Sequence, residues 1–240
     1  MLPSFLMADR IEHFVDVDAL SRGAAAQVAT WLKTAIADNG EASLVLAGGS
    51  TPKKLHAVLV SQAGYDGVDW SKVSIYFGDE RAVGPDHDDS NFKMAADTLI
   101  EPLPVKPRAV HRMKGELGHV EAALEYESLV PPQLDVVLLG MGEDAHTASL
   151  FPGRPEVETT GQRVIAAFGP KPPPERISLT LDALNSASQV GFLVSGAGKA
   201  QALADVLAER KAGTPTLPSA RVQPTSGEVT FFVDAAAAGR

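Results

Sequence analysis

The 240-residue sequence contains no cysteine, which excludes disulfide bonds, thiolate metal sites and a cysteine nucleophile. A chain without thiols suits a reducing compartment, so the cytoplasm is the expected location. Long apolar runs are missing too, since none approaches the roughly 18 residues that span a bilayer. The opening residues "MLPSFLMADR" lack a basic leader followed by a long apolar stretch. No membrane association is therefore expected.

Positive charge is scarce as well, because 21 lysines and arginines face 30 aspartates and glutamates, giving a net charge of −9. Sequence-independent binding to nucleic acid depends on a basic face, so no nucleic-acid partner is expected. An acidic protein that binds an anion must gather its few cations and backbone amides at one place. The positions of these cations therefore indicate where an anionic substrate could bind.

Short apolar segments alternate with helical patterns along the whole chain, which is typical of β-α-β units. Strands are expected at residues 11–17, 43–49, 72–81, 107–113, 134–139, 163–168, 189–196 and 228–234. Helices are expected at residues 19–38, 52–59, 88–100, 118–130 and 199–211, and a proline-rich loop at 171–184 leads into a strand or helix start. The pattern predicts an α/β fold: a single doubly wound, mainly parallel, Rossmann-like sheet with helices on both faces. Residues 1–240 are expected to form one domain.

Four loops follow apolar strands in this prediction, and in such sheets ligands bind beyond the carboxyl ends of the strands. The loops are "GGSTPK" (48–53), "GDER" (78–81), "GMGEDAH" (140–146) and "SGAGK" (195–199). We therefore expect their side chains to converge on one site.

The first loop, with Gly48 and Gly49, opens a helix at Pro52, a residue that suits the first helical position. Ser50 or Thr51 is expected to cap this helix. Free backbone N–H groups, the helix dipole and the two hydroxyls would together attract a phosphate. The spacing is not that of a Walker A loop, and a simple strand-to-helix turn remains the alternative.

Three cations lie in or near these loops. Arg81 offers a planar, permanently charged fork at a strand end, Lys199 lies at a glycine-rich turn, and Arg176 leaves the proline-stiffened loop. All three could reach one anion. The alternative for each is a solvated surface charge, which contributes little to stability when paired.

The segment "GMGEDAHTASLFPG" has the G-x-G-x-x-A spacing of a dinucleotide-binding turn. Glu143 and Asp144 would repel a pyrophosphate, however, and "SLFPGRP" ends any helix within about two turns. A histidine two residues after an aspartate, as His146 is, suits a general base near neutral pH, although a lone histidine is more often structural. Neither a cofactor nor a metal site is expected.

Taken together, "LAGGSTPKKLH", "YFGDERAVGPDHDDSNFKMA", "LLGMGEDAHTASLFPG", "ERISLTLDALN" and "SGAGKAQAL" resemble the 6-phosphogluconolactonase family, across nearly the whole chain. The wider superfamily includes glucosamine-6-phosphate deaminases, but "TASLFPG" is similar to the lactonases. The resemblance implies hydrolysis of 6-phospho-D-glucono-1,5-lactone in the oxidative pentose phosphate pathway, without a cofactor. A deaminase-like isomerase and a non-catalytic sugar-phosphate sensor are the alternatives.

By the same resemblance His146 is the general base, and Asp144 or Asp79 orients its imidazole. The implied substrate-binding residues are Gly48, Gly49, Ser50, Thr51, Arg81, Arg176 and Lys199. The implied partner is a small sugar-phosphate lactone, and the chain is expected to be a monomer or a weak homo-oligomer. It departs from the family pattern at Ala145, where glycine is usual, at Ala82, where an aromatic is common, and at Gly84, where proline is usual. If position 145 requires φ > 0, an alanine there either costs about 1 kcal/mol or shifts the loop.

Overall fold

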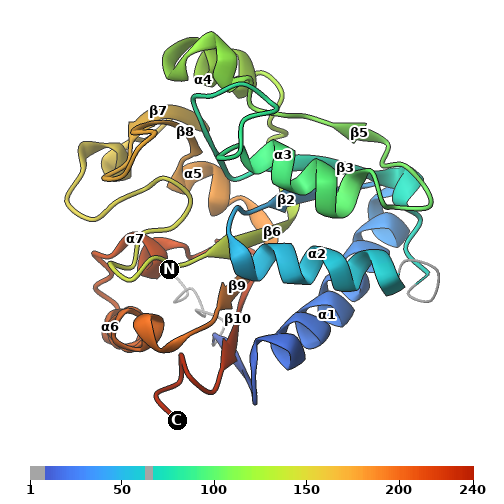
Figure 1. Ribbon diagram of the computed structural model, residues 1–240. Coiled ribbons are helices and arrows are strands. Elements are labelled where there is room, and N and C mark those ends of the chain that lie inside the picture. Colours follow the sequence, from blue (N-terminus) through green and yellow to red (C-terminus); the bar gives the residue numbers. More distant parts are fainter. Residues whose placement is uncertain (1–8, 63–66) are drawn as a thin grey trace, which may run out of the picture.

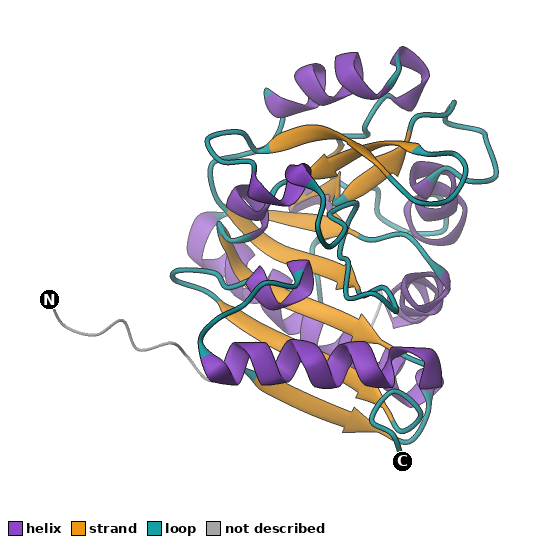
Figure 2. Cartoon of the chain, turned by 90° about the vertical axis from the view of Figure 1, so that its left-hand side faces the viewer, coloured by secondary structure: helices purple, strands orange, loops and turns teal. Residues whose placement is uncertain are grey.

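A parallel sheet of seven strands forms the centre of the molecule in the computed structural model, which describes residues 9–62 and 67–240 (Figure 1). The strand order is β1-β10-β9-β6-β2-β3-β5, and every neighbouring pair is parallel. The strands are β1 (Arg10–Phe14), β2 (Ala42–Leu46), β3 (Val73–Phe77), β5 (Ala109–Val110), β6 (Leu134–Gly140), β9 (Ala187–Val194) and β10 (Glu228–Asp234). Figure 2 shows their arrows running side by side. The predicted α/β fold with a mainly parallel sheet is confirmed.

A second, smaller sheet lies beside the first and was not predicted. It is antiparallel and contains β4 (Asp79–Arg81), β8 (Glu175–Leu179) and β7 (Val164–Phe168), in that order. The expected strand at 72–81 is therefore two strands. Gly78 separates them: its N–H donates to the Leu46 carbonyl at 2.9 Å in the large sheet, and its carbonyl accepts from the Leu179 N–H at 2.8 Å in the small one.

Helices cover both faces of the large sheet, as predicted (Figure 1). They are α1 (Val17–Asn39), α2 (Ser50–Gln62), α3 (Asn91–Ala95), α4 (His119–Glu127), α5 (Leu181–Leu184), α6 (Ala200–Ala212) and α7 (Pro218–Arg221). A π-helical turn, η2 (Ala96–Ile100), continues α3, and 3-10 turns are η1 (Trp70–Lys72), η3 (Gly115–Leu117), η4 (Pro155–Glu158) and η5 (Ala197–Lys199). None of the helices in the described ranges is long and apolar enough to cross a membrane.

Several predicted boundaries were wrong for local reasons. The first strand ends at Phe14, not at residue 17, because the Asp16 side chain accepts the Ala19 N–H at 2.7 Å and starts α1. Ser50 is already the first residue of α2, so Ser50 and Thr51 lie in its first turn and do not precede it. The short helix α7 was not predicted. Residues 1–8, in the stretch without a leader pattern, lie outside the described residues.

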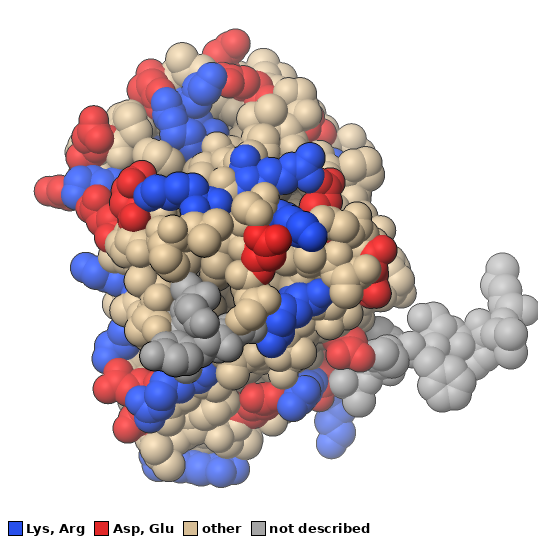
Figure 3. All heavy atoms as spheres, turned by 90° about the vertical axis from the view of Figure 1, so that its right-hand side faces the viewer, with Lys and Arg blue, Asp and Glu red and all other residues tan. Residues whose placement is uncertain are grey.

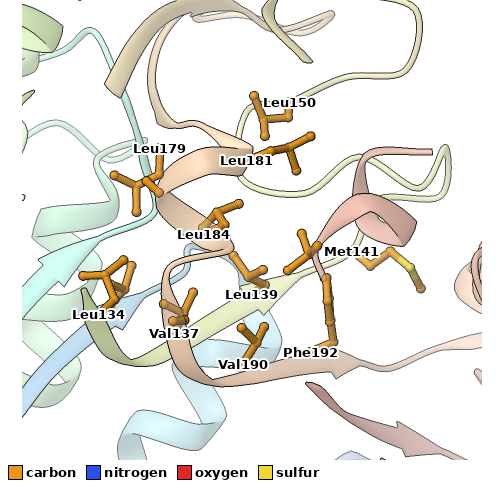
Figure 4. Close-up of a cluster of buried hydrophobic side chains, with 14 of the residues drawn as sticks. Leu134, Val137, Leu139, Met141, Leu150, Leu179, Leu181, Leu184, Val190 and Phe192 are labelled. Atoms are coloured by element: carbon orange, nitrogen blue, oxygen red, sulfur yellow. The ribbon is translucent and has the colours of Figure 1, made fainter. Parts of the chain in front are cut away.

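Two hydrophobic clusters pack against opposite faces of the large sheet. Along β6, Val136 and Leu138 belong to the cluster under α1 and α2, whereas Val137 and Leu139 belong to the other one. This alternation follows from the two-residue period of a strand. Figure 4 shows Val137 and Leu139 facing Leu184 of α5. With both faces covered, the central strands hold the loops at their carboxyl ends in fixed positions.

His56 of α2 is the one histidine in the described ranges that is fully buried. Its Nδ1 lies 2.9 Å from the Thr98 hydroxyl, and its Nε2 has no hydrogen-bond partner among the residues the structure describes. Burial lowers the pKa of His56 from 6.5 to about 4, because the charged imidazolium would lose its hydration. The side chain is therefore neutral in the folded protein near neutral pH.

We expect the free energy of unfolding to fall as the pH drops from 6.5 towards 4, because the unfolded chain binds a proton at His56 that the folded chain excludes. The loss from this group alone is about 3 kcal/mol at the acid end of the window. Urea unfolding of the parent and of His56→Gln at a series of pH values measures it. The carboxylates titrate in both proteins, so the difference between the two curves of unfolding free energy against pH isolates the contribution of His56. Two parallel curves would contradict the prediction.

Candidate active site

The four loops that follow β2, β3, β6 and β9 lie at one edge of the large sheet. These strands are adjacent, in the order β9-β6-β2-β3, and all are parallel, so their carboxyl ends point the same way. The sequence prediction that these loops converge is confirmed, because residues from all four line a single pocket.

Two adjoining pockets form a continuous cleft over this edge, with volumes of about 250 and 470 Å³. All ten residues singled out from the sequence line it. Eight line the first pocket: Gly48, Gly49, Ser50, Thr51, Asp79, Arg81, His146 and Lys199. The second pocket adds Asp144 and Arg176, and it shares Asp79, Arg81, His146 and Lys199 with the first.

His146 and Asp144 form a close pair in the loop after β6, residues 140–148, called the His146 loop below. The imidazole Nδ1 lies 2.5 Å from Asp144 Oδ1, and the same oxygen accepts the His146 backbone N–H at 3.1 Å. Burial raises the pKa of Asp144, but the hydrogen bonds from the imidazole and the backbone outweigh it, so the pKa lies below its usual range. An ionised Asp144 favours the tautomer with the proton on Nδ1, which leaves the Nε2 lone pair free.

Gly142 makes room for this pair. A Cβ added to Gly142 would lie 2.0 Å from His146 Nδ1 and 2.4 Å from Asp144 Oδ1, distances at which atoms overlap. The G-x-G spacing of the loop therefore accommodates an imidazole. After His146 the chain forms turns up to the 3-10 turn η4, and the long helix that a dinucleotide cradle requires is not present there.

Asp79 lines both pockets and its carboxylate is held by two side chains. Oδ2 accepts the Ser149 hydroxyl at 2.7 Å, and Oδ1 accepts the Asn91 amide at 3.2 Å. Of the two acids expected beside the imidazole, Asp144 is the one in contact with it. Asn91 is buried and also faces Gly48, where a Cβ would lie 2.0 Å from its Oδ1. Sequence reasoning missed Asn91 because it follows an acidic loop that looks solvated.

Glu80, next to Asp79, points into the protein and is almost completely buried. One of its carboxylate oxygens accepts the N–H groups of Arg81 and Asn91 at 2.8 and 2.7 Å. The other accepts the Phe92 N–H at 2.8 Å and the Ser90 hydroxyl at 3.0 Å. Burial raises the pKa of Glu80, and these hydrogen bonds only partly oppose the shift. Glu80 thus fastens the start of α3 to β4, while Asp79 faces the cleft.

Arg81 and Arg176 lie directly opposite each other on β4 and β8. Arg81 donates to the Asp89 carbonyl and Arg176 to the Lys171 carbonyl, yet the Nε of each is buried without a hydrogen-bond partner among the described residues. Burial and then the charge of Arg81 lower the pKa of Arg176. Two neighbouring cations in a cleft attract an anion. Lys171, which sequence reasoning missed in its proline-rich loop, lines the same pocket.

Ala145 has a φ of 63°, so alanine occupies a left-handed position at the site of the first family departure. Its side chain is buried, and the conformation costs about 1 kcal/mol relative to glycine. Ala148, which lines both pockets, is also left-handed, with a φ of 48°. The other departures are mild: the Ala82 N–H continues the β4–β8 pairing at 3.0 Å, and a Cβ on Gly84 would meet open space.

On the face shown in Figure 3, basic and acidic side chains are interspersed and do not form a field of one sign. Within residues 9–62 and 67–240, no three His, Asp or Glu side chains gather in a way that could hold a metal ion. In the cleft, by contrast, Arg81, Arg176 and Lys199 lie around the His146–Asp144 pair.

Comparisons with known proteins show similarity along most of the chain. The family described as glucosamine-6-phosphate isomerases/6-phosphogluconolactonase matches residues 15–231. The chain is 38% identical to a 6-phosphogluconolactonase of Nostoc, with 96% of this chain and 98% of that protein aligned. It is 37% identical to a probable chloroplastic 6-phosphogluconolactonase of rice, covering 82% of this chain and 66% of that protein, just under two thirds of its length. The solved structure of 6-phosphogluconolactonase from Trypanosoma brucei is 27% identical and superimposes with a TM-score of 0.84, over 97% and 98% of the two chains. The chain therefore belongs to the glucosamine-6-phosphate isomerase/6-phosphogluconolactonase family.

Proposed function

We propose that this protein hydrolyses 6-phospho-D-glucono-1,5-lactone to 6-phosphogluconate, a step of the oxidative pentose phosphate pathway. The observation that carries the proposal is the His146–Asp144 pair, with a free imidazole Nε2, in a cleft that also contains the positive end of α2 and two arginines. The names of the Nostoc and rice relatives support the same reaction.

In the proposed mechanism His146 Nε2 accepts a proton from a water molecule as its oxygen attacks the lactone carbonyl. The resulting tetrahedral oxyanion collapses, the bond from C1 to the ring oxygen breaks, and the imidazolium returns the proton to that oxygen. The new carboxylic acid then ionises near neutral pH, which gives 6-phosphogluconate and releases a proton. Asp144 keeps the proton on Nδ1 and stabilises the imidazolium. Backbone N–H groups of the glycine loops would stabilise the oxyanion.

The phosphate is proposed to lie against the turn that begins α2. Gly48, Gly49, Ser50 and Thr51 line that pocket at the helix N-terminus, where the dipole favours an anion. Arg81 and Lys199 line the same pocket, and Arg176 adds positive charge from the adjoining one. This arrangement supplies the local cations that an acidic chain needs.

Asp79 is proposed to act on the segment that follows His146, through its hydrogen bond with Ser149. Because Asp144 already occupies Nδ1 of the imidazole, Asp79 is not required to orient the ring. We also propose that the chain unfolds as one domain, since the two hydrophobic clusters share β6.

A direct test is proton release after addition of fresh 6-phosphogluconolactone, corrected for spontaneous hydrolysis. The deaminase-like alternative predicts ammonia release from glucosamine 6-phosphate. The sensor alternative predicts binding of the phosphosugar without any turnover. Proton release well above the spontaneous rate supports the proposal, and its absence in a folded protein would reject it.

Replacing Arg81 with glutamine should raise KM for the phosphorylated lactone at least about tenfold and change kcat less than about threefold, because the phosphate loses a charged fork remote from the carbonyl. Steady-state kinetics with the phosphorylated lactone and with glucono-1,5-lactone check this. Activity on the second compound, which has no phosphate, should be insensitive to the substitution. Arg154→Gln is the matched control, since Arg154 is exposed and lines neither pocket. A parent-like KM in Arg81→Gln would contradict the assignment.

A further inference from the structure

The His146 loop is held from behind by a helix that is distant in sequence. Within the loop, Gly142 N–H donates to the His146 carbonyl at 2.8 Å, and Ala145 N–H donates to the Gly142 carbonyl at 3.1 Å. These contacts close the turn but do not fix the left-handed Ala145, whose carbonyl points out of the turn. That carbonyl is bound by Ser219 of α7.

Ser219 donates twice to this carbonyl. Its backbone N–H lies 3.1 Å from the Ala145 oxygen, and its hydroxyl lies 2.8 Å from the same atom. The hydroxyl is also 3.3 Å from the His146 carbonyl, the weaker branch of a shared hydrogen bond. Ser219 is completely buried, so water cannot replace the hydroxyl. One side chain thus holds the carbonyls of both residues that determine where the imidazole points.

The helix α7 is itself anchored independently of the loop. Arg221 forms two hydrogen bonds with Glu158, at 2.5 and 3.1 Å. Arg210 of α6 donates to the carbonyls of Ala220 and Val222 at 3.1 and 2.6 Å. These contacts hold α7 in place, so it can serve as a fixed support for the His146 loop. A hydrogen bond orients its acceptor only when the donor is itself held in position.

We propose that Ser219 is a positioning residue for catalysis, which holds Ala145 in its left-handed conformation and thereby keeps His146 aligned with Asp144. The inference rests on the proposed role of His146 as the general base. The support is needed because alanine, unlike glycine, resists a φ of 63°. Without the hydroxyl, the loop gains access to conformations in which the imidazole no longer faces the substrate carbonyl.

Removing the hydroxyl in Ser219→Ala is expected to lower kcat about tenfold and to leave KM within about twofold, because the phosphate contacts are on other loops. The decisive comparison repeats the substitution in an Ala145→Gly background. Glycine adopts the left-handed conformation without help, so there Ser219→Ala should lower kcat less than about threefold. A merely structural role would give the same loss in both backgrounds.

Ser21→Ala is the matched control, since Ser21 is also buried and donates to a carbonyl, that of Val17 at 2.7 Å, within α1 and outside the cleft. Ser21→Ala should lower the free energy of unfolding about as much as Ser219→Ala does, and its kcat should equal that of the parent. Circular dichroism and thermal unfolding verify that each variant is folded. A parent-like kcat in Ser219→Ala, or an equal loss in both backgrounds, would overturn the proposal. His146→Ala, assayed alongside, distinguishes failure of the proposed general base from failure of the proposed role of Ser219. If His146→Ala is fully active, the general-base assignment is wrong, whatever the activity of Ser219→Ala.

Discussion

Replacement of His146 by alanine is expected to lower kcat for 6-phosphogluconolactone hydrolysis about 10³-fold, with KM changed less than about threefold. General-base assistance by a positioned side chain is worth about 10²–10⁴-fold, and in the described cleft the imidazole next to Asp144 is the group we propose for this role. The phosphate-binding residues lie on other loops, so substrate binding should persist. The measurement is the initial rate of proton release under saturating lactone, corrected for spontaneous hydrolysis.

His13→Ala provides the control for this substitution, because His13 is exposed on β1 and lines neither pocket. Its kcat should equal that of the parent. Asp144→Asn tests the partner: the imidazole loses its charged acceptor, so kcat should fall, though less than in His146→Ala. Hydrolysis by His146→Ala as fast as by the parent would show that another group activates the water.

Addition of a single methyl group in Gly142→Ala should lower kcat at least about 10²-fold. The new Cβ would overlap the imidazole Nδ1 and Asp144 Oδ1, so the ring must leave its place beside Asp144. A displacement of about 1 Å in a reacting group can cost about 10²-fold in rate. The ring is the free end of a partly exposed side chain and can swing aside, so the thermal unfolding midpoint should change by only a few degrees.

Gly84→Ala is the matched glycine control, since its new Cβ would meet open space and the residue lines neither pocket. Both variants are compared by steady-state kinetics and by thermal unfolding. Undiminished kcat in Gly142→Ala would mean that the observed position of the imidazole is not the one used in catalysis.

Most of the cleft could be predicted from the sequence, because ligands bind beyond the carboxyl ends of parallel strands. Each of the four loops follows an apolar strand, and because the strands are adjacent and parallel, the nine chosen residues in these loops lie together. The tenth, Arg176, comes from β8 of the small sheet. The rule works because it needs only local patterns and the common direction of the strands. The sequence also singled out Ala145 as a departure from the family pattern, and the structure shows that this residue is left-handed.

The features that could not be predicted from the sequence depend on contacts between segments that are distant along the chain. The break at Gly78 exists because its two backbone groups pair with strands about 30 and 100 residues away. Asp79 and Glu80 look equivalent in the sequence, yet one faces the cleft and the other is buried against α3. Lys171 comes from a loop and Ser219 from the short helix α7, and neither segment carries a strand-end signal, so only the folded chain reveals their neighbours.

The arginines that face each other across β4 and β8 place two positive charges side by side in the cleft, an arrangement of electrostatic frustration. Two guanidinium groups held side by side repel each other, and the buried Nε of each has no hydrogen-bond partner among the described residues. An anion between them would convert this repulsion into two attractions at once. The stability that the fold gives up by holding like charges together would thus be recovered as affinity when the proposed anionic substrate binds.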